Sequence, residues 1–210
     1  MIHLSASKAC IKLPRSIEDV LRNIGSHFSR SHSRQMKYKE FQEFFKVEIH
    51  KILSPCTTRW LSLKACVDRI LEQYPALKEY FRLLHFEDPS KTLEQIYDTL
   101  NNSFTIVYLE FMSYILGILT SFNTLFQGTG SLLYLLKPEI EKLLKTVCLN
   151  FMTIGYIRNL VTIINVSPNA TEYQLPINEI YIGVTATESI TNLINSNEIT
   201  KFYKSCQEFY

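Results

Sequence analysis

The sequence has few residues that break regular structure and shows none of the common catalytic motifs. It contains 6 Gly and 7 Pro among 210 residues, so long regular elements are expected. The GxGxxG, P-loop, HExxH and GxSxG patterns do not occur. None of the five His lies four residues from another, the spacing of paired zinc ligands on a helix. We therefore predict that the chain is not an enzyme, holds no cofactor or metal and has no small-molecule substrate.

Cysteine is present, but in a pattern that argues against cross-links. The number is odd, the spacings are long and no CxxC pair occurs; the five residues are Cys10, Cys56, Cys66, Cys148 and Cys206. A disulfide framework needs an even set, and a zinc site needs closely spaced ligands. The first residues also lack the apolar core of a signal peptide. We therefore expect an intracellular protein that is not secreted.

Charge is unevenly distributed along the chain, although the net charge is only +2. Residues 1–69 hold 13 Lys/Arg against 6 Asp/Glu, and residues 70–210 hold 9 against 14. A basic first part about 1–69 is compatible with attraction to nucleic acid phosphates, and also with solvated helix faces. The remainder is about 70–210. We treat residues 1–210 as one domain with these two parts.

Apolar spacing is helical over most of the chain, which predicts a mainly α, multi-helix fold. We predict a first helix that is capped by Ser16 and carries one apolar face, formed by Ile17, Val20, Leu21, Ile24 and Phe28. A second helix is predicted from Arg34 to His50 that buries Phe41, Phe44 and Phe45, with Ile49 as a further candidate. Ser54-Pro55 is expected to end the second helix. A third helix starts near Thr57, and Pro75 stands in the first turn of another. Asp88-Pro89-Ser90 is predicted to form a turn and to cap the helix that follows.

The second half of the chain is less uniform. Helices are predicted from Ser103 to Gln127, from Leu132 to Met152 and from Asn197 to Tyr210, the last capped by Ser196. Residues 154–166 are rich in β-branched side chains and stay ambiguous between helix and strand.

The segment Phe104 to Phe126 is apolar and long enough to require a comparison with membrane spans. It contains Glu110 and several Ser, Thr and Asn side chains, which are costly in a bilayer. We therefore predict a helix buried on most sides of a bundle and no membrane partner.

Three blocks of sequence occur in the order expected for one known family. They are HLSASKAC at residues 3–10, CTTRWLSL at residues 56–63 leading to ILEQYPALK at 70–78, and LPINEIYIG at 175–183. Together they resemble the hAT-family DNA transposases, especially the animal BED-finger proteins derived from them. The resemblance runs over nearly the whole chain.

The resemblance implies a helical insertion domain with little or none of the RNase H-like β-sheet. In that family three carboxylates bind two metal ions that cleave and join DNA strands. By their order in the family, two of these carboxylates fall before Met1 and the third falls after Tyr210. His3 resembles the His of a family Cys-x-x-His motif whose Cys also falls upstream. The resemblance therefore implies a chain truncated at both ends and without catalytic residues.

The resemblance also implies two DNA-binding residues. In the family, the Trp of the Arg-Trp block stacks on a flipped base at the cleaved DNA end. Here that residue is Trp60, the only Trp in the chain, and Arg59 lies beside it. Stacking on an aromatic ring contributes roughly 1–3 kcal/mol per base. The alternative is that Trp60 belongs to the core stripe of its helix with Leu63 and Val67.

These observations give one leading hypothesis and two alternatives. The leading one is a catalytically inactive relative or fragment of a hAT transposase that retains weak DNA binding and contacts related transposase-derived proteins in the nucleus. The alternatives are a protein-interaction module without nucleic-acid binding and a non-functional transposon relic.

Overall fold

The computed structural model describes residues 6, 8–29, 31–55, 61–87, 90–127 and 132–210. Within these residues helices predominate and no strand is assigned; one isolated antiparallel bridge joins Met152 and Gln174. The prediction of a mainly α fold is confirmed. The chain divides into two compact units, one made of Pro14–Ser113 and the other of Met1–Leu13 with Tyr114–Tyr210. The change in charge near residue 69 lies inside the first of these units.

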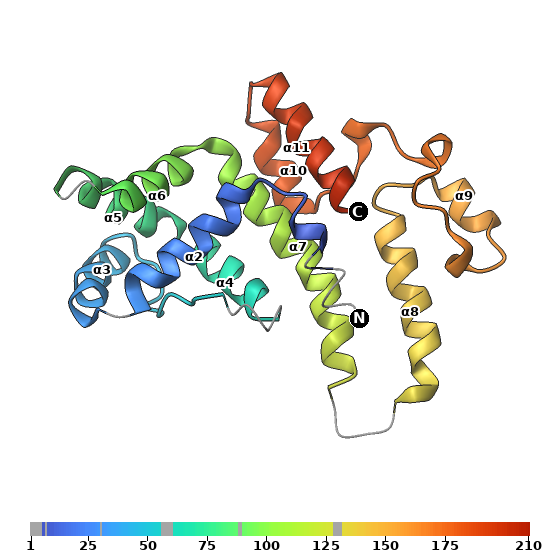
Figure 1. The fold of residues 1–210 in the computed structure, drawn as a ribbon, viewed down its shortest axis with the longest axis horizontal. Helices are drawn as coiled ribbons and strands as arrows, with labels where there is room; N and C mark the ends of the chain where they lie inside the picture. Colours follow the sequence, from blue (N-terminus) through green and yellow to red (C-terminus); the bar gives the residue numbers. More distant parts are fainter. Residues whose placement is uncertain (1–5, 7, 30, 56–60, 88–89, 128–131) are drawn as a thin grey trace. The chain divides into compact units, whose positions relative to one another are not determined.

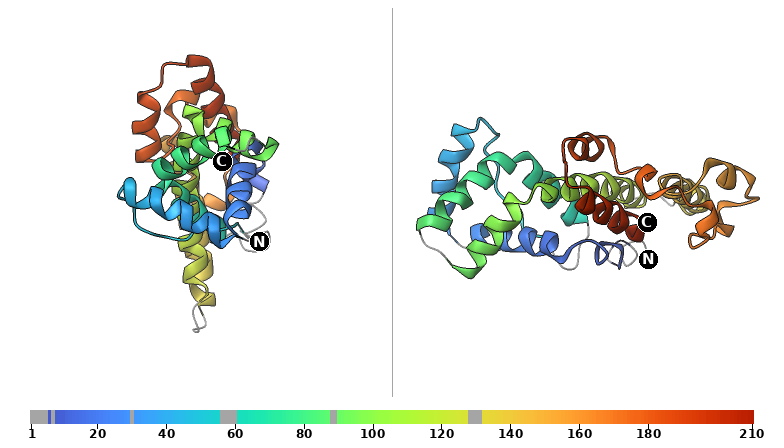
Figure 2. Two further views of the ribbon diagram at one scale, coloured as in Figure 1. Left: turned by 90° about the vertical axis from the view of Figure 1, so that its left-hand side faces the viewer. Right: turned by 90° about the horizontal axis from the view of Figure 1, so that it is seen from above.

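The unit Pro14–Ser113, hereafter the helical unit, contains five complete helices and the start of a sixth among its described residues. They are α2 (Arg15–Ser29), α3 (His32–Phe44), α4 (Leu61–Glu72), α5 (Tyr74–Glu87), α6 (Lys91–Asn101) and the beginning of α7 (Ser103–Leu125). Within this unit α6 lies beside α2 and α5, and α5 also lies beside α3 (Figures 1 and 2). The core includes a cluster of aromatic rings from α2, α3 and α5, whose members are Phe28, Tyr38, Tyr80 and Phe81.

The first helix begins slightly earlier than predicted. The amide of Ile17 already donates to the carbonyl of Pro14 at 3.0 Å, so helical hydrogen bonding starts before Ser16. Ser16 is therefore inside α2, and the prediction that it caps the helix is wrong. The predicted apolar stripe is confirmed, because Ile17, Val20, Leu21, Ile24 and Phe28 are all buried.

The end of α3 contradicts the predicted second helix. The helix stops at Phe44, and Lys46 adopts a left-handed backbone with φ of 53°. The amide of Val47 then donates to the carbonyl of Gln42 at 3.1 Å, a bond typical of a helix C-terminus closed by a left-handed residue. Ser54-Pro55 thus does not end this helix. Phe44 is 78% exposed and Ile49 54% exposed, so their predicted burial is wrong too.

Two predicted helix starts agree well with the structure. Pro75 is the second residue of α5, where its missing N–H costs no hydrogen bond. Ser90 caps α6, and its hydroxyl accepts from the amide of Leu93 at 3.4 Å.

The long apolar helix α7 matches its prediction in its first half only. Side chains such as Val107, Leu109 and Phe111 are fully buried, whereas residues 117–125 are half-buried or exposed. Among the described helices, α7 is the one long and apolar enough to cross a membrane by length and composition. Half of its most apolar 18-residue window is buried. A buried core helix passes the same test, so this finding is weak support for a membrane span.

The second unit combines helices with short irregular segments. Its helices are the rest of α7, α8 (Leu133–Cys148), α9 (Ile154–Asn159), α10 (Val184–Thr191) and α11 (Ser196–Phe209). Single 3-10 turns lie at η1 (Ile163–Asn165), η2 (Thr171–Tyr173) and η3 (Ile177–Glu179). The ambiguous stretch 154–166 is thus α9 and η1. The predicted Ser196 cap is off by one residue, because Asn195 accepts the amide of Glu198 at 3.3 Å.

Candidate functional site

The three site residues predicted from the sequence, His3, Arg59 and Trp60, lie outside the described residues. The segment that leads to Arg59 and Trp60 is described, however. Residues 47–55 have no regular structure, and they run between the end of α3 and the start of α4. Neighbouring side chains of the helical unit hold this segment.

A buried pair of glutamines holds the segment in place. Gln42 on α3 is 2% exposed, and Gln73, between α4 and α5, is fully buried. The Gln73 side-chain oxygen accepts from Tyr38 Oη at 3.1 Å and from Gln42 Nε2 at 2.8 Å. Its nitrogen donates to the Glu48 carbonyl at 2.8 Å and to Glu72 Oε1 at 3.0 Å. Gln73 thus uses all four hydrogen-bonding positions of its amide.

Gln42 and Arg69 extend this arrangement along the segment. Gln42 Nε2 also donates to the His50 carbonyl at 2.9 Å, and Arg69 Nη1 donates to the Lys51 carbonyl at 2.9 Å. Three carbonyls within four residues are therefore held by side chains from the helices. We call Tyr38, Gln42 and Gln73 the glutamine clamp. Because its members are buried and mutually bonded, it fixes the local path of the chain.

Outside the clamp lies a group of charged side chains. His50 Nδ1 lies 2.6 Å from Glu72 Oε1, and His50 Nε2 lies 3.4 Å from Glu48 Oε2. Partial burial acts to raise the pKa of Glu72. The hydrogen bonds from His50 and Gln73 and the charges of Arg69 and His50 outweigh this and lower the pKa.

The same three side chains, Glu48, His50 and Glu72, bring possible metal-ligand atoms within 4.8 Å of one another. However, Glu72 Oε1 already accepts from His50 and Gln73, and Oε2 lies 3.0 Å from Arg69 Nε. Both oxygens of Glu72 are thus engaged, so we interpret the group as an ion-pair layer over the clamp.

Six Lys/Arg side chains of the basic first part form ion pairs within the helical unit. These pairs are Arg15–Asp19, Arg22–Glu18, Lys37–Glu87, Lys39–Glu43, Lys64–Asp68 and Arg69–Glu72. Lys46 and Lys51 are exposed and have no carboxylate at ion-pair distance in the described part of the chain. The uncompensated charge of this unit therefore includes two lysines on the segment that leads to Arg59 and Trp60.

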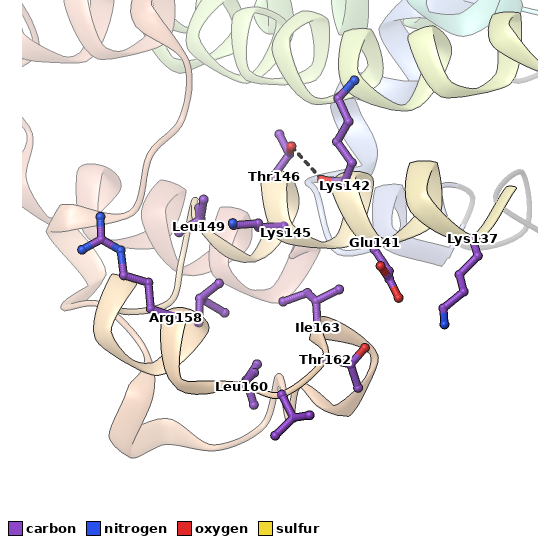
Figure 3. A pocket seen from close by; sticks show the side chains of 12 residues that line it. Lys137, Glu141, Lys142, Lys145, Thr146, Leu149, Arg158, Leu160, Thr162 and Ile163 are labelled. Carbon is purple, nitrogen blue, oxygen red and sulfur yellow. Dashed lines mark hydrogen bonds between the residues drawn. The ribbon is translucent and has the colours of Figure 1, made fainter. Parts of the chain in front are cut away.

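A second feature, which the sequence did not indicate, is a groove between α8 and the segment that contains α9 and η1. Its volume is about 690 Å³ (Figure 3). Lys137, Lys145 and Arg158 lie on its rim, and no carboxylate in the described residues forms an ion pair with any of them. Lys142 also lines it, but pairs with Glu139 at 3.6 Å. This groove lies within residues 70–210, which carry a net negative charge. The charge pattern of the sequence therefore did not predict a basic groove there.

No protein-family model, curated protein or solved structure matches the chain. The resemblance to hAT transposases therefore depends on the three sequence blocks.

Proposed function

We propose that the chain is a catalytically inactive relative of hAT transposases that binds DNA through residues 46–60. The observation that carries the proposal is the clamped segment before Arg59 and Trp60. It is fixed by buried side chains and presents Lys46 and Lys51 without ion-pair partners.

The chemistry of this segment suits the phosphate backbone and an unpaired base. Free lysines attract phosphates without sequence preference, and their binding releases counterions. Arg59, further along the sequence, offers a planar donor for phosphate oxygens. Trp60 offers a face for a base, at roughly 1–3 kcal/mol per stacked base. A pre-fixed segment also loses less conformational freedom on binding than a mobile one.

The inactive part of this proposal rests on the resemblance. Two-metal strand transfer needs several carboxylates that converge within a few ångströms. The blocks that resemble the family contain no counterpart of its three catalytic carboxylates.

The test is fluorescence anisotropy of labelled duplex and hairpin DNA at low and moderate salt. Loss of two phosphate contacts in Lys46→Ala/Lys51→Ala should reduce the salt slope of log affinity by about 1.8. Trp60→Ala should weaken hairpin binding by about 5- to 150-fold if one base stacks on it. Lys39→Ala, which removes a lysine already paired with Glu43, is the matched control.

Three results would contradict the proposal. One is no binding at low salt by folded wild-type protein. Another is equal binding by wild type and the Lys46/Lys51 variant while circular dichroism shows both folded. Metal-dependent nicking of supercoiled plasmid by the pure protein would overturn the inactive assignment. A nuclear location and contact with related transposase-derived proteins are also part of the proposal, and imaging of a tagged full chain tests the location.

A protein-interaction module is the second candidate. It is favoured by exposed large apolar side chains, which include Phe44, Phe86, Leu133 and Tyr134. Leu133 and Tyr134 are neighbours in the sequence, and contiguous exposed apolar surface is typical of partner sites. A monodisperse monomer by light scattering that binds no hydrophobic dye would argue against this candidate.

A further inference from the structure

The side chains that line the α8–α9 groove carry more positive than negative charge. Lys137 and Lys145 are eight residues apart on α8, which places them about 12 Å apart along the helix. Arg158 contributes a guanidinium from α9 on the other wall (Figure 3). Glu141 is the one acidic residue among the lining residues. The rim therefore presents an excess of positive charge that the described residues do not neutralise by ion pairs.

The floor of the groove is aliphatic. It is formed by Leu149, Ile157, Leu160 and Ile163, and no aromatic ring is among the lining residues. Val161, at its edge, is fully exposed. Bases of a single-stranded nucleic acid bind such proteins mainly by stacking on aromatic rings, which this floor lacks. Leucine and isoleucine side chains of a partner, by contrast, gain from covering an aliphatic floor.

We propose that this groove binds an acidic amphipathic helix of a protein partner. An amphipathic helix places apolar anchors at i, i+3 or i+4, and i+7, and its flanks are free to carry Glu or Asp. Such a helix sets its apolar anchors on Leu149, Leu160 and Ile163 and its carboxylates near Lys145 and Arg158. The volume of about 690 Å³ lies within the range of roughly 300–1,000 Å³ that is usual for binding pockets.

The inference is independent of the proposed DNA contact. It concerns other elements, a different unit and a different class of partner. Failure of DNA binding by the Lys46/Lys51 segment would leave it unaffected.

The experiment uses the full chain and a fluorescein-labelled synthetic helix of about 16 residues with a Leu stripe and Glu flanks. Binding is followed by anisotropy. Lys145→Glu/Arg158→Glu should weaken binding at least about tenfold and should favour a peptide whose flanks carry Lys instead. The matched control is Lys201→Glu/Lys204→Glu, which makes the same charge change on α11. This control variant should bind the Glu-flanked peptide more tightly than the groove variant does.

Two further probes separate the possible occupants. A peptide of the same composition with the Leu stripe scrambled should bind at least about tenfold more weakly, because its apolar side chains no longer share one face. Equal binding of both peptides would overturn the proposal, as would no binding of the striped one. Tighter binding of a single-stranded oligonucleotide, lost in Lys145→Glu/Arg158→Glu, would assign the groove to nucleic acid and also overturn it.

Discussion

Gln42 and Gln73 lie 31 residues apart in the sequence, yet Nε2 of Gln42 donates a hydrogen bond to Oε1 of Gln73 at 2.8 Å. Both side chains are buried. This bond ties the end of α3 to the junction of α4 and α5. Both amides also donate to main-chain carbonyls of the intervening segment, at Glu48 and His50. A contact between two buried polar residues thus helps to fix the path of residues 48–50.

Gln73→Leu should strongly destabilise the protein. It removes the partner of the buried Tyr38 hydroxyl and one of the two bonds of the buried Gln42 amide, and it frees the Glu48 carbonyl. Each buried group left unsatisfied costs about 1–3 kcal/mol. We expect the free energy of unfolding to fall by about 3 kcal/mol or more, measured by urea denaturation. Gln95→Leu, at an exposed position on α6, should change it by about 0.5 kcal/mol or less. Equal effects of the two substitutions would show that the clamp adds nothing to stability.

Two glycines should respond to alanine with opposite signs. Gly183 has φ of 93°, and a Cβ there would lie 2.8 Å from the Tyr114 Cβ, so Gly183→Ala should cost about 1–3 kcal/mol of unfolding free energy. Gly155 lies in α9, and a Cβ there would meet nothing within 4 Å. Gly155→Ala should therefore stabilise by about 0.5–1 kcal/mol. Thermal unfolding of both variants checks this, and a shift of the same sign for both would contradict the local geometry.

His27 should make stability depend on pH. Desolvation, with the charge of Arg34, lowers the pKa of His27 from 6.5 to about 4, and its Nε2 lies 3.0 Å from Tyr80 Oη. As the pH falls, the imidazole of His27 is therefore protonated near pH 6.5 in the unfolded chain but only near pH 4 in the folded chain. The stability from neutral His27 is complete above pH 6.5 and is lost as the pH falls toward 4.

The measurement is urea unfolding at pH 7.5 and pH 5. After allowance for screening of a half-buried group, we expect His27 to account for about 1–2 kcal/mol of the loss between these pH values. His27→Gln should remove that share, and His32→Gln controls for loss of an exposed imidazole. An unchanged pH dependence in His27→Gln would refute the assignment.

Three buried thiols should be unreactive in the folded protein. Burial raises the pKa of Cys66 to about 11, and it also raises the pKa values of Cys148 and Cys206. Because the thiolate is the reactive form, these residues should not react with Ellman's reagent at pH 8 until the chain unfolds. The cleanest sample is Cys10→Ser/Cys56→Ser, in which only these three remain. Rapid reaction of this variant without denaturant would contradict the burial of the thiols.

The helical character of the chain was predictable because it arises from local spacing. The stripe of α2, the first-turn Pro75 and the Ser90 cap need only residues that are near in sequence. The failures have long-range causes. Phe41, Phe44 and Phe45 also form a helical stripe, yet α3 buries Tyr38 and Gln42 instead, because their partner Gln73 lies more than 30 residues further on. The sequence offered no local signal for that choice.

The candidate sites also combine features that the sequence indicated with features that only the structure showed. The resemblance indicated Arg59 and Trp60, but only the structure identified Lys46 and Lys51, on the segment that precedes them in the sequence, as cations without ion-pair partners. The α8–α9 groove had no sequence signal, because its charge belongs to a region of net negative charge and its floor comes from short irregular segments.

The sequence by itself determined the helical fold class and the positions of most helices, since the periodicity of apolar side chains and the capping residues act within a few residues. The tertiary structure alone decided where α3 ends, which of its faces is buried and which cations are left without partners. Those outcomes depend on hydrogen bonds and ion pairs between residues far apart in the chain, and their energies exist only once the helices have packed.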